Sequence, residues 1–136
     1  MAFNENKIYV TATSSIEEIH FDTTTNSNAY VTKYTFSPEA SSVYTINMFL
    51  NAFNTTTNVE VFSAIALGSF YRDNVPNAPV VVAGGVGFNS TIQHNSAPPL
   101  QYRLLVSGNV VEFQCDGNST DVIRWIITMK IIKNVN

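Results

Sequence analysis

The last third of the chain constrains the fold most, because it holds three alternating segments separated by two tight turns. The first turn is Gly108-Asn109, a pair that supplies the positive φ angles of a two-residue hairpin. The second covers residues 116–120 and leads into residues 122–131. Alternate residues of a strand share one face, and the apolar face of this last segment holds Ile123, Trp125, Ile127, Met129 and Ile131. The pattern predicts a β-meander that closes an antiparallel sandwich and indicates a structural or binding module.

The rest of the chain repeats this alternation in short segments. Residues 43–53 alternate most cleanly, and residues 59–71 are apolar on both faces, which predicts a strand covered on both sides. No segment shows a sustained helical period of 3.6 residues. The sequence therefore predicts an all-β, antiparallel, jelly-roll-like β-sandwich with about eight to ten short strands.

The chain of 136 residues is long enough for one domain with a sizeable core. We expect residues 1–136 to form a single β-sandwich domain. Residues 4–6 are polar, and we expect residues 1–6 to be a flexible or docking N-terminal tail.

The composition excludes several classes of partner. Charged residues make up 12% of the chain, while 16 Asn, 14 Thr and 12 Ser give it a polar, weakly charged character. The net charge is −3 and the few Lys and Arg residues are scattered, which argues against nucleic-acid binding. Apolar runs are too short to span a membrane. The first residues lack the pattern of a signal peptide, so we expect synthesis in the cytoplasm.

The reactive side chains form no recognisable catalytic or metal-binding motif. Cys115 shares the apolar face of its segment and is expected to be a core thiol. His20 and His94 lie far apart in the sequence, without further ligands at metal-binding spacing. Residues 84–87 are glycine-rich but lack the Lys-Ser/Thr of a phosphate loop. We expect no enzymatic activity, no cofactor and no metal.

Several strands carry apolar residues on the face opposite the core stripe. Scattered exposed apolar residues are normal, but several on adjacent strands indicate a buried partner surface. Loops that cover these strands are the alternative explanation. We expect a subunit interface that contains Phe49, Phe53, Leu105, Val110, Val122 and Ile126.

Three stretches, taken in order, resemble a module of bacteriophage virions. The first is the strand-like segment 43–46 followed by the polar turn 54–58. The second is residues 64–72, which end in aromatic and basic side chains. The third is the hairpin 106–117, which leads into Ile123-Arg124-Trp125. Together they resemble the small jelly-roll domain of phage tail fibres, spikes and head-decoration proteins, although residues 114–121 are more polar than the turn of that family.

The resemblance implies a non-enzymatic structural protein of the virion, made in the host bacterial cytoplasm. It would be a capsid decoration or head fibre, or a tail fibre component, that assembles as a homotrimer and contacts other virion structural proteins. The alternative is a carbohydrate-binding, lectin-like module or a receptor-binding tip that recognises host surface glycans. Its candidate contacts are exposed tyrosines, namely Tyr30, Tyr34, Tyr71 and Tyr102. A third hypothesis, a small β-sandwich hydrolase, would require His and acidic residues that converge on one site, and the sequence shows no such motif.

Overall fold

The computed structural model describes residues 2–11, 13–57, 61–74, 80–82, 89–94, 100–117 and 120–136. Within these residues all regular secondary structure is β-strand, as the sequence predicts. The strands are β1 (Ala2–Val10), β2 (Ser14–Thr25), β3 (Val31–Phe36), β4 (Ser42–Asn54), β5 (Val61–Arg72), β6 (Val80–Val82), β7 (Asn89–His94), β8 (Gln101–Ser107), β9 (Val110–Asp116) and β10 (Ile123–Val135).

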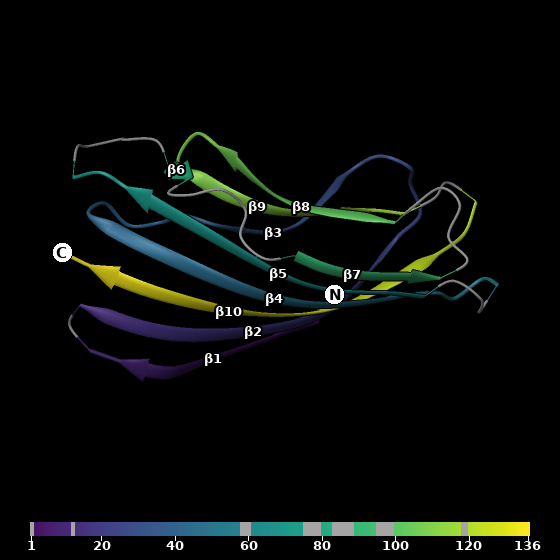
Figure 1. Cartoon of the computed structure of the whole chain (residues 1–136), viewed down its shortest axis with the longest axis horizontal. Coiled ribbons are helices and arrows are strands. Elements are labelled where there is room, and N and C mark those ends of the chain that lie inside the picture. The colour runs from purple at the N-terminus through teal and green to yellow at the C-terminus, as the bar shows by residue number, and fades with distance from the viewer. Residues whose placement is uncertain are drawn as a thin grey trace.

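The strands form two layers (Figure 1). The large sheet has the order β1-β2-β10-β4-β5-β6, and β7 also pairs with β5. The small sheet has the order β3-β9-β8. Every pairing is antiparallel, and the chain passes from one sheet to the other between β2 and β3, β3 and β4, β7 and β8, and β9 and β10. The antiparallel β-sandwich is confirmed, with two layers of unequal width. The predicted β-meander is wrong in its last step, because β8 and β9 pair in the small sheet whereas β10 lies between β2 and β4 in the large sheet.

The core lies between the two sheets and contains the stripe predicted for the last strand. Four of its members in β10 are fully buried and Ile131 is nearly so. Trp125 is the largest buried side chain; its indole Nε1 donates a 2.9 Å hydrogen bond to Thr25 Oγ1, and its ring meets Phe62 edge to face at 5.6 Å. The polar end of the indole is therefore satisfied inside an otherwise apolar core.

The N-terminal part of the chain is more ordered into strands than the sequence indicates. Residues 2–6 are not a free tail but the start of β1, which pairs with β2 from Ala2 opposite Asp22 onward. Strand β2 also continues to Thr25, through residues expected to form a polar turn. Thr23 and Thr25 are buried, because a β-branched side chain suits a strand and the Thr25 hydroxyl accepts the indole hydrogen bond.

Strand β5 is covered on one face only, which corrects the expectation of cover on both. Phe62, Ala64 and Ala66 point into the core and are at most 4% exposed. Ile65 points the other way and is 43% exposed. The sandwich has only two layers, so nothing within the described chain covers the far face of the large sheet.

The hairpin between β8 and β9 uses one positive φ angle rather than two. Gly108 has a φ of 62°, whereas Asn109 is not among the described residues with a positive φ. A glycine at the first central position is the requirement of a type II′ turn. The glycine-rich segment 84–87 lies outside the described residues.

Cys115 is a core thiol, as expected, since it is buried in the small sheet. Burial raises the pKa of its thiol to about 12. We expect the native chain to resist alkylation by iodoacetamide at pH 8, because the thiolate is the reactive species and both its population and its access are low. Mass spectrometry should detect the adduct rapidly only after denaturation. Equal labelling rates in the native and denatured chain would contradict this assignment.

Candidate interaction surface

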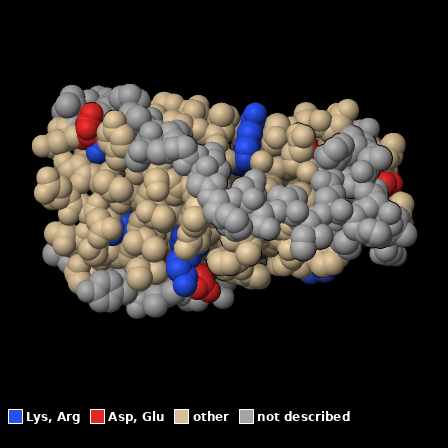
Figure 2. Space-filling view, in the orientation of Figure 1, with Lys and Arg blue, Asp and Glu red and all other residues tan. Residues whose placement is uncertain are grey.

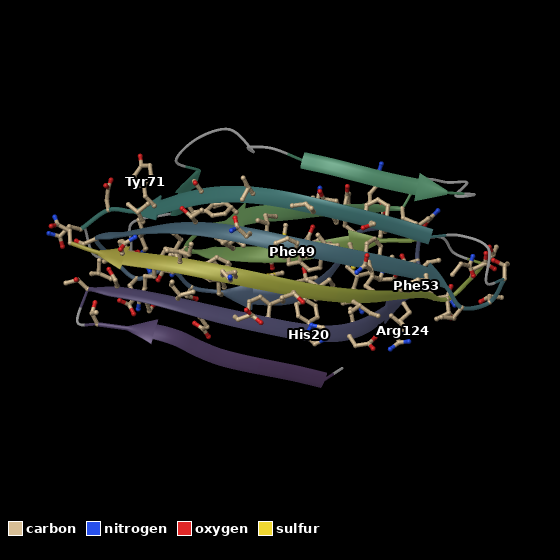
Figure 3. The ribbon with its side chains drawn as sticks, turned by 60° about the horizontal axis from the view of Figure 1, so that its bottom comes forward. His20, Phe49, Phe53, Tyr71 and Arg124 are labelled. Atoms are coloured by element: carbon tan, nitrogen blue, oxygen red, sulfur yellow. The ribbon has the colours of Figure 1, made fainter. Side chains whose placement is uncertain are left out.

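The outer face of the large sheet, which is the side turned away from the small sheet, carries exposed apolar side chains. Val43, Phe49 and Phe53 in β4 and Ile65 in β5 are between 43% and 50% exposed, which makes them the large apolar side chains most open to solvent in the described chain. Figure 3 shows Phe49 and Phe53 on this face of the central strands. Apolar residues concentrated on one face indicate a partner surface rather than random exposure.

The strand register brings three of these side chains together with Ile126 of β10. Phe49 lies opposite Ile65 of β5. Ile126 of β10 lies opposite Asn51, midway along β4 between Phe49 and Phe53. Side chains opposite each other in an antiparallel pair are about 5 Å apart at Cβ, and diagonal neighbours such as Ile126 and Phe49 are about 7–8 Å apart, within reach of large side chains. We call Phe49, Phe53, Ile65 and Ile126 the outer apolar stripe.

Charged residues border the stripe in compensating pairs. Arg124 Nε donates hydrogen bonds of 3.0 and 3.1 Å to the two carboxylate oxygens of Asp22, and these bonds lower the pKa of Asp22. Lys130 of β10 and Glu18 of β2 also lie opposite each other, further along these two strands. His20 Nδ1 is hydrogen-bonded to Thr128 Oγ1 at 2.9 Å. The two oppositely charged pairs therefore add no net charge to this border.

The outer face has the size and composition of a protein interface. Strands β2, β10, β4 and β5 have 12 or 13 residues each, which gives a length of about 40 Å, and four strands span about 19 Å. The resulting footprint of about 750 Å² is close to the roughly 800 Å² that each partner contributes to a standard interface. An apolar centre with a polar border is the usual anatomy of such an interface.

The described part of the face shown in Figure 2 has no cluster of charged residues that would indicate a second binding surface. Lys, Arg, Asp and Glu are few there and lie scattered among uncharged residues. Among the described residues there is also no helix long and apolar enough to cross a membrane.

The structure separates the residues that the sequence assigns to a subunit interface. Phe49, Phe53 and Ile126 lie together on the outer face. Leu105 and Val110 belong to the small sheet, in β8 and β9. Val122, the last of the predicted residues, lies just before β10 and is hydrogen-bonded to residues 55 and 56. The outer face also exposes Ile65 and Val43, which the sequence did not assign to the interface. Ile65 was overlooked because its segment reads as a strand buried on both sides.

The candidate tyrosines do not converge on one surface. Tyr34 stacks on the core residue Phe21 with ring centroids 5.9 Å apart, and Tyr102 packs against the core near Phe62. Tyr71 lies on the outer face, opposite Val43 of β4. Tyr30 borders the small sheet. A shared glycan platform of these four side chains is therefore absent from the described chain.

The described residues include no group of three or more His, Cys, Asp or Glu side chains that could hold a metal ion. His20 and His94 lie in β2 and β7, and β10, β4 and β5 lie between these strands in the sheet order. The two histidines therefore do not form a pair.

A polar cluster covers one end of the small sheet. The Arg103 guanidinium lies 3.9 Å from the centre of the Tyr30 ring, and Tyr30 Oη donates a 3.2 Å hydrogen bond to Gln101 Oε1. Beside them Asp116 is only 8% exposed, and its Oδ1 has no hydrogen-bond partner. Burial raises the pKa of the Asp116 carboxyl. An ionised carboxylate at this position costs stability at neutral pH.

We expect Asp116→Asn to increase the free energy of unfolding at pH 7, by an amount on the order of 1 kcal/mol. Because the pKa of Asp116 is raised in the folded state, its stabilising contribution is present below the unfolded pKa and is lost as the pH rises through the folded pKa. Urea unfolding from pH 7 to pH 4 should show the advantage of the variant shrinking as the pH falls.

The matched control is Asp22→Asn, since the pKa of Asp22 is lowered in the folded state. The stability that Asp22 contributes is present above its unfolded pKa and is lost as the pH falls, so its replacement gives no gain at pH 7. An Asp116→Asn variant with the same advantage at every pH would rule out titration as the cause.

Comparisons with known proteins add little. No protein-family model matches the chain, and no curated protein matches it in sequence. Among solved structures, the tailspike protein of Acinetobacter baumannii phage AM24 is similar, with a TM-score of 0.48 and 10% sequence identity. The match covers 85% of this chain, which spans 26% of the tailspike chain. This is a weak likeness to a phage tail protein, and we infer nothing about the function from it.

Proposed function

We propose that this chain is a non-catalytic structural module of a bacteriophage virion, which assembles as a homotrimer through the outer face of its large sheet. The observation that carries the proposal is the outer apolar stripe, of which Phe49, Phe53 and Ile65 are at least 43% exposed on the single chain. The resemblance of residues 43–58, 64–72 and 106–125 to phage jelly-roll modules supports the virion and the trimer.

A second copy of the chain suits this face better than a strongly charged partner does. The ion pair of Asp22 with Arg124 and the opposed Glu18 and Lys130 leave the border electrically balanced. Two such faces therefore meet without net repulsion, while their apolar centres leave water. In a ring of three, each copy divides this face between two contacts, so each contact receives about half of the footprint, roughly 375 Å² per partner.

In the virion the module would decorate the capsid, as a decoration subunit or head fibre, or form part of a tail fibre. The chain is rich in Asn, Ser and Thr and poor in charged residues. Such a composition is compatible with exposure on a particle and with contacts to other virion structural proteins.

Cross-linking tests which face forms the contact. Asn51 is exposed on the outer face between Phe49 and Phe53, and Thr35 is exposed on the small sheet. We expect a flexible bismaleimide to join chains of the Asn51→Cys variant into covalent dimers, because each chain offers one accessible thiol, whereas Thr35→Cys should remain monomeric on a denaturing gel. The native Cys115 is buried and should not interfere. Cross-linking of Thr35→Cys alone, or of neither variant, would overturn the proposed face.

A further inference from the structure

A cleft of about 210 Å³ opens between the layers, at the place where β3 meets the inner face of the large sheet. Its apolar lining includes Tyr34 and Phe36 of β3, Tyr44 of β4 and Ile131 of β10. The three aromatic rings follow one another with centroids 6.5 and 5.8 Å apart. The cleft therefore has aromatic rings from both layers in its lining and is separate from the outer face.

The wall formed by the β3–β4 connection is fixed by side chains from other parts of the fold. Arg72 Nη1 donates a 2.7 Å hydrogen bond to the carbonyl of Pro38. The next residue, Glu39, donates its backbone N–H to Tyr44 Oη at 3.1 Å and accepts a hydrogen bond from Ser42 Oγ at its carbonyl. A cleft whose wall is held in this way loses little conformational entropy when a ligand enters.

The polar groups of the cleft both donate and accept hydrogen bonds. Lys133 Nζ pairs with Glu39 Oε1 at 3.0 Å, and Glu17 and Ser15 also line the cleft. The two carboxylates disfavour an anionic ligand. A neutral ligand with several hydroxyl groups can donate hydrogen bonds to the carboxylates and accept them from the ammonium group.

We propose that this cleft binds a single neutral sugar unit, with the ring against Phe36 and its hydroxyl groups hydrogen-bonded to Glu17, Ser15 and the Lys133–Glu39 pair. Apolar C–H faces of a sugar match flat aromatic rings, and hydroxyl groups match carboxylates and ammonium groups. The volume equals that of about seven water molecules, which is room for one six-membered ring and too little for two.

Saturation-transfer-difference NMR tests the proposal, with methyl glycosides of glucose, galactose, mannose and N-acetylglucosamine as probes. We expect at least one probe to bind with a dissociation constant in the millimolar range. Glu17→Gln keeps the size of the side chain but removes the charge, and it should weaken binding about tenfold, as expected for the loss of a charge-assisted hydrogen bond. Phe36→Leu, which keeps an apolar side chain without the flat ring, should weaken binding as well.

Glu112→Gln on the outer side of the small sheet is the matched control and should leave binding unchanged; thermal unfolding of each variant verifies its fold. The proposal is overturned if no sugar probe receives saturation, or if binding is as strong in both cleft variants as in the native chain. A response to tetramethylammonium instead of the sugars would also overturn it. The readout does not depend on the oligomeric state, so its failure would be distinct from a failure of the trimer.

Discussion

Replacing Trp125 with Ala should lower the free energy of unfolding by about 3–5 kcal/mol, the largest stability effect we expect from one substitution in this chain. Trp125 is fully buried in β10, the strand that lies between β2 and β4 in the large sheet. Its removal leaves a cavity beside Phe62 and deprives the buried Thr25 hydroxyl of its indole donor. A loss of this size is a large fraction of the total stability of a domain.

Urea unfolding followed by far-ultraviolet circular dichroism measures this loss without relying on the tryptophan signal. Arg124→Ala is the matched control, because Arg124 is adjacent in sequence, exposed and joined to Asp22 by a surface ion pair, which contributes little to stability. A Trp125→Ala variant no less stable than Arg124→Ala would contradict the placement of the indole in the core.

Replacing Phe49 with Asp should dissociate the trimer while the sandwich stays folded. Phe49 is 46% exposed in the single chain and faces away from the core, so a carboxylate at this position is solvated in the monomer. In the assembly the same carboxylate would lie against Ile65 and the apolar stripe of a second copy, without a compensating charge. We expect light scattering to give the mass of one chain at every concentration at which the native chain is trimeric.

Thr35→Asp provides the control, since it adds the same charge on the exposed side of the small sheet. It should leave the mass unchanged. The unfolding midpoint of Phe49→Asp should stay near that of the native chain, whereas Thr35→Asp should be somewhat less stable, because its carboxylate lies opposite Glu112. A trimer that persists in Phe49→Asp but dissociates in Thr35→Asp would move the interface to the small sheet.

Alternation along single strands was sufficient to predict much of the fold. The stripe from Ile123 to Ile131 and the buried position of Cys115 follow from the two-residue period, because one face of a strand in a sandwich must enter the core. The end of β2 was not predicted, because residues 22–25 are polar. Thr23 and Thr25 are nevertheless buried, and Thr25 accepts a hydrogen bond from Trp125, 100 residues away in the sequence. Such a partner has no local signal.

The outer apolar stripe could be predicted in part from the sequence, and the cleft could not. Phe49 and Phe53 were recognisable as apolar residues on the wrong side of an otherwise regular strand. Ile65 was not, because the sequence cannot distinguish a strand buried between two layers from one that presents an apolar face to a partner. The cleft brings together β2, β3, β4 and β10, and its composition depends on pairings that no local pattern specifies.

The mass of the native chain in solution, measured by light scattering over a dilution series, tests the central claim most directly. The proposed assembly predicts three times the 15.0 kDa of one chain, maintained on dilution through the micromolar range. A folded chain that keeps the mass of a monomer at every concentration would contradict the assembly and leave the outer apolar stripe without its proposed partner.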